Sequence, residues 1–268
     1  MYDNICKFLV EQFSQDFASW FLGRSVPLTE LSPQELSLEP IRADSLILKS
    51  SDQLILHLEF QTKPDPDIPF RMADYRLRVY RRFPDLQMRQ AVVYLKATDS
   101  PLVYENSFTL SQTSHEFEVI RLWEQPTKAF FNSPGLLPFV VLSQCKNPTE
   151  ELRKVSRVLD KIPNPRIQAN VSAASAILAG LVLDRELITT ILRRDIMQES
   201  VIYQQWREEI YQEASEKLAE QFRLETIDRL LQVARNLLAS GMPLEQIAAV
   251  TGLELEQIQR LSNELTGN

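Results

Sequence analysis

The segment from Gln53 to Thr62 limits most strongly what this chain can fold into. Its sequence, Gln-Leu-Ile-Leu-His-Leu-Glu-Phe-Gln-Thr, is an apolar run that contains a single carboxylate, Glu59. Such a run indicates a central strand covered on both faces, because a half-exposed strand alternates apolar and polar side chains. A carboxylate in a covered strand requires a partner, since an unpaired buried charge is strongly destabilising. We therefore expect this strand to lie in the core of a sheet and Glu59 to have a partner for its charge.

A second strand-like run, from Ala43 to Lys49, precedes this segment, and the polar turn Ser50-Ser51-Asp52 joins the two. Folding the chain on this turn places Asp44 opposite Leu58 or Glu59. A shift of the register by one residue still keeps Asp44 close to Glu59. The sequence therefore predicts a hairpin that brings two carboxylates together.

A divalent cation would explain this pair of carboxylates. Side chains alternate along a strand, so Glu59 and Gln61 share one face while Phe60 points to the other. Facing carboxylates repel each other, but Mg²⁺ or Mn²⁺ binds carboxylate and amide oxygens and keeps several waters. Such an ion stabilises the charge that develops on a phosphate during hydrolysis. The alternative is a solvent-facing hairpin with Lys49 and Lys63 as surface partners; the apolar surroundings of Glu59 favour the metal site.

The order of the elements predicts an α/β core followed by helices. An amphipathic helix is expected over Ile5–Phe21, and a further helix over Arg71–Phe83. Apolar, β-branched runs predict strands at Gln90–Leu95 and Glu116–Trp123. We divide the chain into three parts, which are an α/β core (1–145), a helical region packed on that core (146–198), and a long helix with a small helix-turn-helix-like tail (199–268).

These residues also carry a family resemblance. Asp44, fourteen intervening residues and Glu59-Phe60-Gln61 resemble the PD-(D/E)XK nuclease signature in an E-x-Q variant. The wider motifs resemble the Rpn recombination-promoting nucleases, which are also labelled transposases, and the cyanobacterial-type members of that group. These motifs are Arg42-Ala-Asp44, His57-Leu-Glu-Phe-Gln61 and Phe70-Arg-Met-Ala-Asp-Tyr75.

The resemblance implies a restriction-endonuclease-like fold, with a mixed central sheet flanked by helices, that cleaves DNA with Mg²⁺ or Mn²⁺. Asp44, Glu59 and the backbone carbonyl of Phe60 would hold the metal, and Asp44, Glu59 and Gln61 would be the catalytic residues. An acid of the first helix, Glu11 or Asp16, would support the site. Strand transfer by a true transposase rests on the family label alone.

Gln61 stands where the usual motif has a lysine. A lysine can position the attacking water and help to neutralise the phosphate, whereas a glutamine can orient the water but brings no charge. Lys63 or Arg71 could supply the missing charge. The alternative function is therefore a nuclease-like fold that binds DNA or protein without cutting it. His57 shares the face of Glu59 and is either a general base or, as is commoner, a structural histidine.

A basic helix follows the predicted metal strand. Between Arg71 and Arg89 there are six arginines and two acids. Helical spacing places Arg71, Tyr75, Arg78 and Arg82 on one face. With Lys63, these residues could bind DNA phosphates beside a cleavage site. The alternative is a solvated face whose basic side chains cover apolar surface.

The rest of the chain suggests where the protein works and what it contacts. The formal net charge is −7, and no apolar run reaches the length of about 20 residues that a membrane helix needs. Cys6 and Cys145 suit a reducing compartment, and we expect a cytoplasmic protein with no membrane partner. The stretch Glu199–Ser240 offers a surface for a homodimer. In the helix-turn-helix-like tail, Gly252 stands where a tight turn is expected. The candidate recognition helix that follows, Glu254–Leu261, has two acids and one arginine, which favours contact with a protein partner or folding back on the long helix over base reading.

Overall fold

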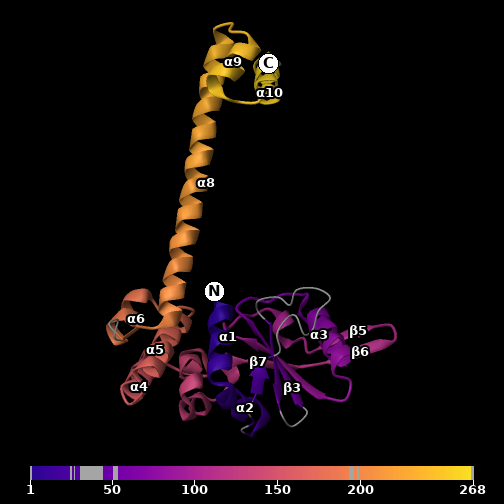
Figure 1. Cartoon of the computed structure of the whole chain (residues 1–268), viewed down its shortest axis with the longest axis vertical. Helices are drawn as coiled ribbons and strands as arrows, with labels where there is room; N and C mark the ends of the chain where they lie inside the picture. Colours follow the sequence, from indigo (N-terminus) through magenta and orange to yellow (C-terminus); the bar gives the residue numbers. More distant parts are fainter. Residues whose placement is uncertain are drawn as a thin grey trace. The chain divides into compact units, whose positions relative to one another are not determined.

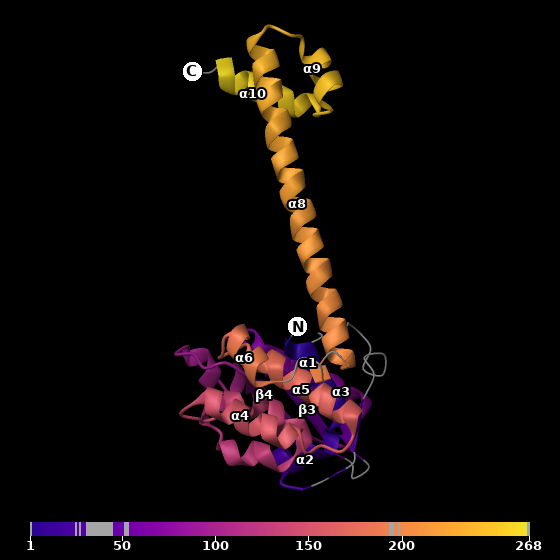
Figure 2. The same cartoon turned by 90° about the vertical axis from the view of Figure 1, so that its left-hand side faces the viewer.

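The computed structural model describes residues 2–24, 26, 28–30, 45–50, 54–192, 196–197 and 199–266. The chain divides into two compact units, Met1–Trp206 and Arg207–Asn268. Figures 1 and 2 show the elements of both units in two views. Our division at residues 145 and 198 stays a prediction.

The first unit is built on a mixed five-stranded sheet of order β1-β2-β3-β4-β7. Strands β1, β2 and β3 pair antiparallel, whereas β3, β4 and β7 pair parallel. Parallel neighbours require a crossover connection, and α3 supplies it between β3 and β4. The strands are β1 (Leu28–Glu30), β2 (Ser45–Ser50), β3 (Leu54–Gln61), β4 (Gln87–Tyr94) and β7 (Glu118–Arg121).

The expected hairpin pair is present with a shifted register. Strands β2 and β3 are antiparallel neighbours, and Ser45 pairs with Glu59. This register differs by one residue from the nearer of the two that we expected. Asp44 lies outside the described residues. Strand β3 is central and almost wholly buried from Leu54 to Phe60, which confirms the interpretation of its apolar run.

The two faces of the sheet are covered differently. Figure 1 shows α3 and the β5–β6 hairpin on one side of the sheet, and α1 with α4–α6 on the other. Helix α3 spans Ile68–Arg82, and the hairpin consists of β5 (Ser107–Leu110) and β6 (Thr113–Glu116). Our prediction of this helix is confirmed, with its start three residues earlier than expected. The separate two-stranded hairpin was not predicted.

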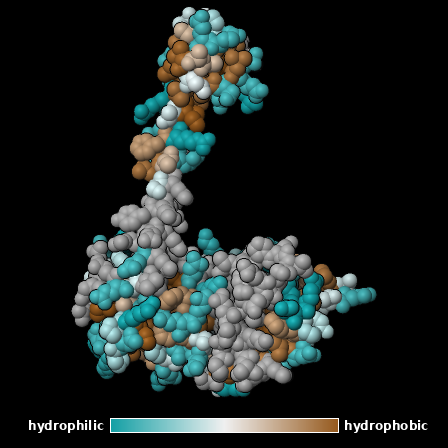
Figure 3. Space-filling model, in the orientation of Figure 1, coloured by the Kyte–Doolittle hydropathy of each residue, from teal (hydrophilic) through white to brown (hydrophobic). Residues whose placement is uncertain are grey.

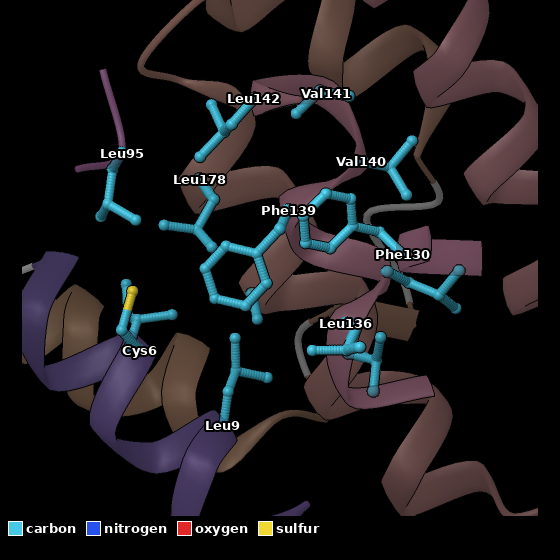
Figure 4. Close-up of a cluster of buried hydrophobic side chains, with 14 of the residues drawn as sticks. Cys6, Leu9, Leu95, Phe130, Leu136, Phe139, Val140, Val141, Leu142 and Leu178 are labelled. Atoms are coloured by element: carbon cyan, nitrogen blue, oxygen red, sulfur yellow. The ribbon is translucent and has the colours of Figure 1, made fainter. Parts of the chain in front are cut away.

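Most of the hydrophobic core lies on the other side. It is formed by α1 (Tyr2–Gln12), α2 (Ser14–Leu22), the 3₁₀ run η5 (Pro134–Leu142), α4 (Pro148–Leu159), α5 (Pro165–Ala179) and α6 (Arg185–Ile191). Phe60 points into this core, as expected, and its ring stacks on Phe139 at 6.2 Å between centroids. Figure 4 shows Phe139 between Leu9 of α1, Leu178 of α5 and Leu95. The helical region after residue 146 therefore packs on the same core as the sheet.

Three short 3₁₀ segments join these elements. Segment η2 (Pro101–Tyr104) lies between β4 and β5, whereas η3 (Leu122–Glu124) and η4 (Thr127–Asn132) connect β7 to η5. The predicted strand Glu116–Trp123 is divided accordingly, because β6, β7 and η3 each take part of it.

Two of the helices begin with the same local signal. Asn147 caps α4 by accepting the backbone N–H of Glu150, and Asn164 caps α5 by accepting two backbone N–H groups. A proline follows each asparagine, where the helix has no use for an N–H donor.

The predicted helix over Ile5–Phe21 is instead two helices that break at Phe13. The break allows a close approach to Gly135, since a Cβ at that glycine would collide with the Phe13 side chain. The backbone N–H of Gly135 also donates to the Asp16 carboxylate at 2.9 Å. A contact between residues so distant in the chain leaves no local trace in the helical periodicity.

The second unit contains most of α8 (Val201–Ala239), with α9 (Leu244–Thr251) and α10 (Leu255–Thr266). Ala234, Ile247 and Ile258 meet in its small core. Helix α9 ends at Gly252 with φ of 70°, a left-handed conformation that glycine adopts without strain. The expected turn at this glycine is thus confirmed. In the part of the chain that the structure describes, no helix is both long and apolar enough to cross a membrane.

Candidate active site

Glu59 lies at the centre of the sheet, on the face that α3 covers. Its side chain has no exposed surface. Arg71 of α3 reaches down to it, and one guanidinium nitrogen forms an ion pair with Oε1 of Glu59. A second nitrogen of Arg71 donates to Oδ2 of Asp65 at 2.9 Å. One arginine therefore joins the strand, the helix and the loop between them.

Asp65 was not singled out in the sequence. Its other oxygen accepts the backbone N–H of Asp67 at 2.9 Å, which holds the loop just before α3. The Pro64-Asp65-Pro66-Asp67 pattern was the available signal, since it marks a rigid turn with an oxygen that can accept from the backbone.

The two oxygens of the Glu59 carboxylate have different surroundings. Gln61 lies on the same face, as expected, and its Nε2 donates to Oε1 at 3.4 Å. Oε1 thus receives both Arg71 and Gln61. Oε2 is buried and has no hydrogen-bond partner among the described residues. Nε2 of His57 lies 3.6 Å from Oε2.

His57 belongs to a chain of polar side chains that sequence reasoning missed. Gln90 of β4 lies within 2.9 Å of His57 through its Nε2 and within 2.9 Å of His115 through its Oε1. Gln90 is buried, and the His57 ring contacts Tyr75 edge to face at 5.0 Å. Burial lowers the pKa of His115, and the charge of Arg76 lowers it further. His57 and Gln90 lie side by side because they are paired in the parallel register of β3 and β4.

Tyr94 lies beside Gln61, its register partner on β4. Its hydroxyl is buried and has no hydrogen-bond partner among the described residues. The pKa of Tyr94 is raised to about 12, chiefly by burial and also by the carboxylates of Asp65 and Glu105, against the charge of Arg71. Tyr94 is therefore a neutral phenol at physiological pH.

The residues predicted to bind DNA fall into two groups. Arg71 and Tyr75 share a helix face, as expected, but that face is buried against the sheet. Arg78 is partly exposed and pairs with Asp74 at 2.8 Å. Arg82 and Lys63 are exposed. Of the two groups expected to replace the missing lysine charge, Arg71 is therefore bound to Glu59, and Lys63 lies at the surface.

Neither candidate acid of the first helical segment lies on the face of Glu59. Asp16 belongs to α2, whose Phe17 packs on Phe60 on the opposite face, and its carboxylate binds the N–H of Gly135. Glu11 is exposed on α1, which packs into the same opposite core.

The oxygens that could hold a metal ion are Oε2 of Glu59 and the carbonyl of Phe60. The Gln61 carbonyl accepts the N–H of Leu95 on the β4 side. Because successive carbonyls of a strand alternate between its two neighbours, the Phe60 carbonyl is directed toward β2. Among the described residues, no group of three or more His, Cys, Asp or Glu side chains could hold a metal ion. A complete ligand set would require Asp44, which is outside those residues.

Comparison with known proteins gives one match. Residues 228–263 match the model of the Rpn/YhgA-like nuclease family, C-terminal HTH domain. The matched segment covers the end of α8 with α9 and α10, and it supports the resemblance to the Rpn family. No curated protein and no solved structure matched the chain.

We predict that Arg71→Met lowers the free energy of unfolding by about 3–5 kcal/mol, because it leaves the Glu59 charge buried without its strongest partner. Replacing both members, as Glu59→Leu with Arg71→Met, should recover most of that loss. Urea unfolding of the full chain measures both. Lys154→Met, which removes an exposed pair with Glu151, is the control and should change stability by less than about 1 kcal/mol. An Arg71→Met effect no larger than this control would contradict the prediction.

We predict an alkaline loss of stability that depends on Tyr94. A phenol whose pKa is raised from 10 to about 12 by folding contributes stability below pH 10 and loses it as the pH rises toward 12. Between pH 9.5 and 11.5 the wild type should lose about 2 kcal/mol more unfolding free energy than Tyr94→Phe. Parallel pH–stability curves that stay superimposed would show that the Tyr94 hydroxyl titrates normally.

Proposed function

We propose that this chain is a metal-dependent endonuclease with a restriction-endonuclease-like core, which hydrolyses DNA phosphodiester bonds with Mg²⁺ or Mn²⁺. The observation that carries the proposal is the Glu59 carboxylate, which is fully buried on a central strand and whose Oε2 has no hydrogen-bond partner among the described residues. The match to the C-terminal HTH domain of the Rpn/YhgA-like nuclease family also supports a nuclease.

The residues at hand suit a hard divalent cation, which prefers carboxylate and carbonyl oxygens. Glu59 and the Phe60 carbonyl would hold the ion together with Asp44. The ion would supply an acidified water and a positive charge for the developing phosphorane. Gln61 would orient that water, and the Arg71 guanidinium would provide the charge that the usual lysine brings.

A non-catalytic nuclease-like fold is the second candidate, and the Glu59–Arg71 ion pair favours it. A carboxylate that is already neutralised by an arginine needs no metal ion for its burial. In that case the chain would bind DNA or a protein partner without cutting.

We propose that DNA is held by the surface members of the predicted set, Lys63, Arg78 and Arg82. Arg71 and Tyr75 are not part of this surface, since both are buried. Arg71 can contact a phosphate only at the site itself.

The matched helix-turn-helix segment has a surface that suits a protein partner better than bases. Glu256 lies in the first turn of α10, with Arg260 one turn further on. An acidic residue at the start of a recognition helix repels phosphates. We therefore propose contact with protein for α10, although such domains commonly bind DNA.

A homodimer through α8 remains part of the proposal. Leu218 and Phe222 are 54% and 61% exposed, and helical spacing places Val233 on the same face. Figure 3 shows apolar residues at the surface of this part of α8. Light scattering of the full chain decides whether two copies associate.

The first test of the function is cleavage of supercoiled plasmid by the purified chain. We expect nicking or linearisation with Mg²⁺ or Mn²⁺, none with EDTA, and a loss of at least about 100-fold in rate for Glu59→Gln. Glu59→Gln keeps the size of the side chain and a bonding partner for Arg71. Equal cutting by both proteins would indicate a contaminant or another site. A folded chain that binds DNA without cutting it would support the second candidate.

A second test concerns the DNA contacts. Each phosphate contact that is removed should make the slope of log K against log salt concentration shallower by about 0.9. We therefore expect Lys63→Ala and Arg82→Ala each to weaken binding to duplex DNA and to reduce that slope. Arg153→Ala on α4 is the matched control, since Arg153 is also exposed and should leave the slope unchanged. Fluorescence anisotropy over a salt series measures all three variants.

A further inference from the structure

Gln90 holds a position that determines the protonation of its neighbours. Its Nε2 lies 2.9 Å from the backbone carbonyl of Met72 and 2.9 Å from Nδ1 of His57. Its Oε1 lies 2.9 Å from Nε2 of His115. Gln90 is 5% exposed, so water does not compete for these bonds.

The Met72 carbonyl fixes the orientation of the Gln90 amide. A backbone carbonyl can only accept, so the Gln90 atom facing Met72 must be the NH₂ group. The opposite orientation would set two oxygens against each other at 2.9 Å. The same NH₂ group donates its other hydrogen to Nδ1 of His57, and Oε1 must accept from Nε2–H of His115.

This pattern leaves one protonation state for His57. Nδ1 accepts from Gln90, so the proton of the neutral ring lies on Nε2. Nε2 faces Oε2 of Glu59 at 3.6 Å, just beyond hydrogen-bond length. Arg71 and Gln61 occupy the other oxygen of the carboxylate. Nε2–H of His57 therefore lies beside Oε2, which has no hydrogen-bond partner in the described part of the chain.

We propose that His57 is a positioning residue for Glu59, held by Met72 through Gln90 as the neutral Nε2–H tautomer that orients Oε2. In this state His57 is neither a general base nor a metal ligand, because one nitrogen carries a proton and the other accepts one. Its effect on a metal ion at Oε2 rests on the proposed function; the tautomer does not.

The tautomer is measured on the full chain labelled with ¹⁵N-histidine. The chain has two histidines, so long-range ¹H–¹⁵N spectra are simple, and His115→Gln assigns them. We expect both rings to be neutral and protonated at Nε2. In Gln90→Glu the new carboxylate can only accept, so His57 should become protonated at Nδ1. A wild-type His57 with a proton on Nδ1, or an unchanged His57 spectrum in a folded Gln90→Glu variant, overturns the tautomer assignment.

The positioning role is measured with Mn²⁺ alone, by titration calorimetry without DNA. Substitution of residues behind a metal ligand commonly weakens binding tenfold or more, so we expect at least about a tenfold higher Kd in Gln90→Glu. His57→Phe, which keeps a ring against Tyr75 and removes both nitrogens, should show a similar loss even if Gln90→Glu fails to fold. His115→Gln, which still offers a donor to Gln90, should bind as the wild type does.

The two measurements separate the inference from the function. An unchanged Kd in folded His57→Phe overturns the positioning role while leaving the metal site intact. If the wild type binds Mn²⁺ no better than Glu59→Gln, the metal site itself fails and the positioning role fails with it. The spectrum still decides the tautomer in that case.

Discussion

The buried ion pair between Glu59 and Arg71 is the interaction on which the first unit depends. A carboxylate at the centre of a covered sheet would be strongly destabilising by itself, and the β3–α3–β4 crossover places an arginine directly over it. Because Arg71 also binds Asp65, the same side chain closes the loop that leads into α3. Arg71 therefore both neutralises the buried carboxylate and holds the loop between β3 and α3.

The same pair makes the two oxygens of the carboxylate unequal, and this difference determines which oxygen could bind a ligand. Oε1 is filled by protein donors, whereas Oε2 is buried without one among the described residues. The side chains around the carboxylate are also fixed in orientation. The Met72 carbonyl of α3 determines the orientation of the Gln90 amide, and Gln90 in turn determines which nitrogens of His57 and His115 carry a proton. A network in which each group has one allowed role holds its members in place more firmly than separate surface contacts do. Such rigidity suits the metal site that we propose at Oε2 of Glu59.

The second unit is held together by apolar packing rather than by a buried ion pair among the described residues. Its small core joins α8, α9 and α10 through aliphatic side chains. The family match falls here, while the carboxylate site lies in the first unit. The acids on the candidate recognition helix and the exposed apolar residues on α8 are the basis of the protein contact that we propose for this unit.

Local patterns in the sequence determined much of this protein. The apolar run of β3, the helical spacing of α3 and the glycine at residue 252 predicted a central strand, a helix and a turn, because each depends on neighbours in the chain. The alternation of side chains also placed His57, Glu59 and Gln61 on one face. Tertiary structure alone decided which face of α3 is covered, so Arg71 and Tyr75 are buried rather than exposed to DNA. It also decided the break at Phe13, the one-residue shift in register, and the meeting of Glu59 with Asp65, and of His57 with Gln90 and His115. Periodicity predicts that a helix has an apolar or a basic face, but the partner of a buried charge is chosen by packing between segments that are distant in sequence.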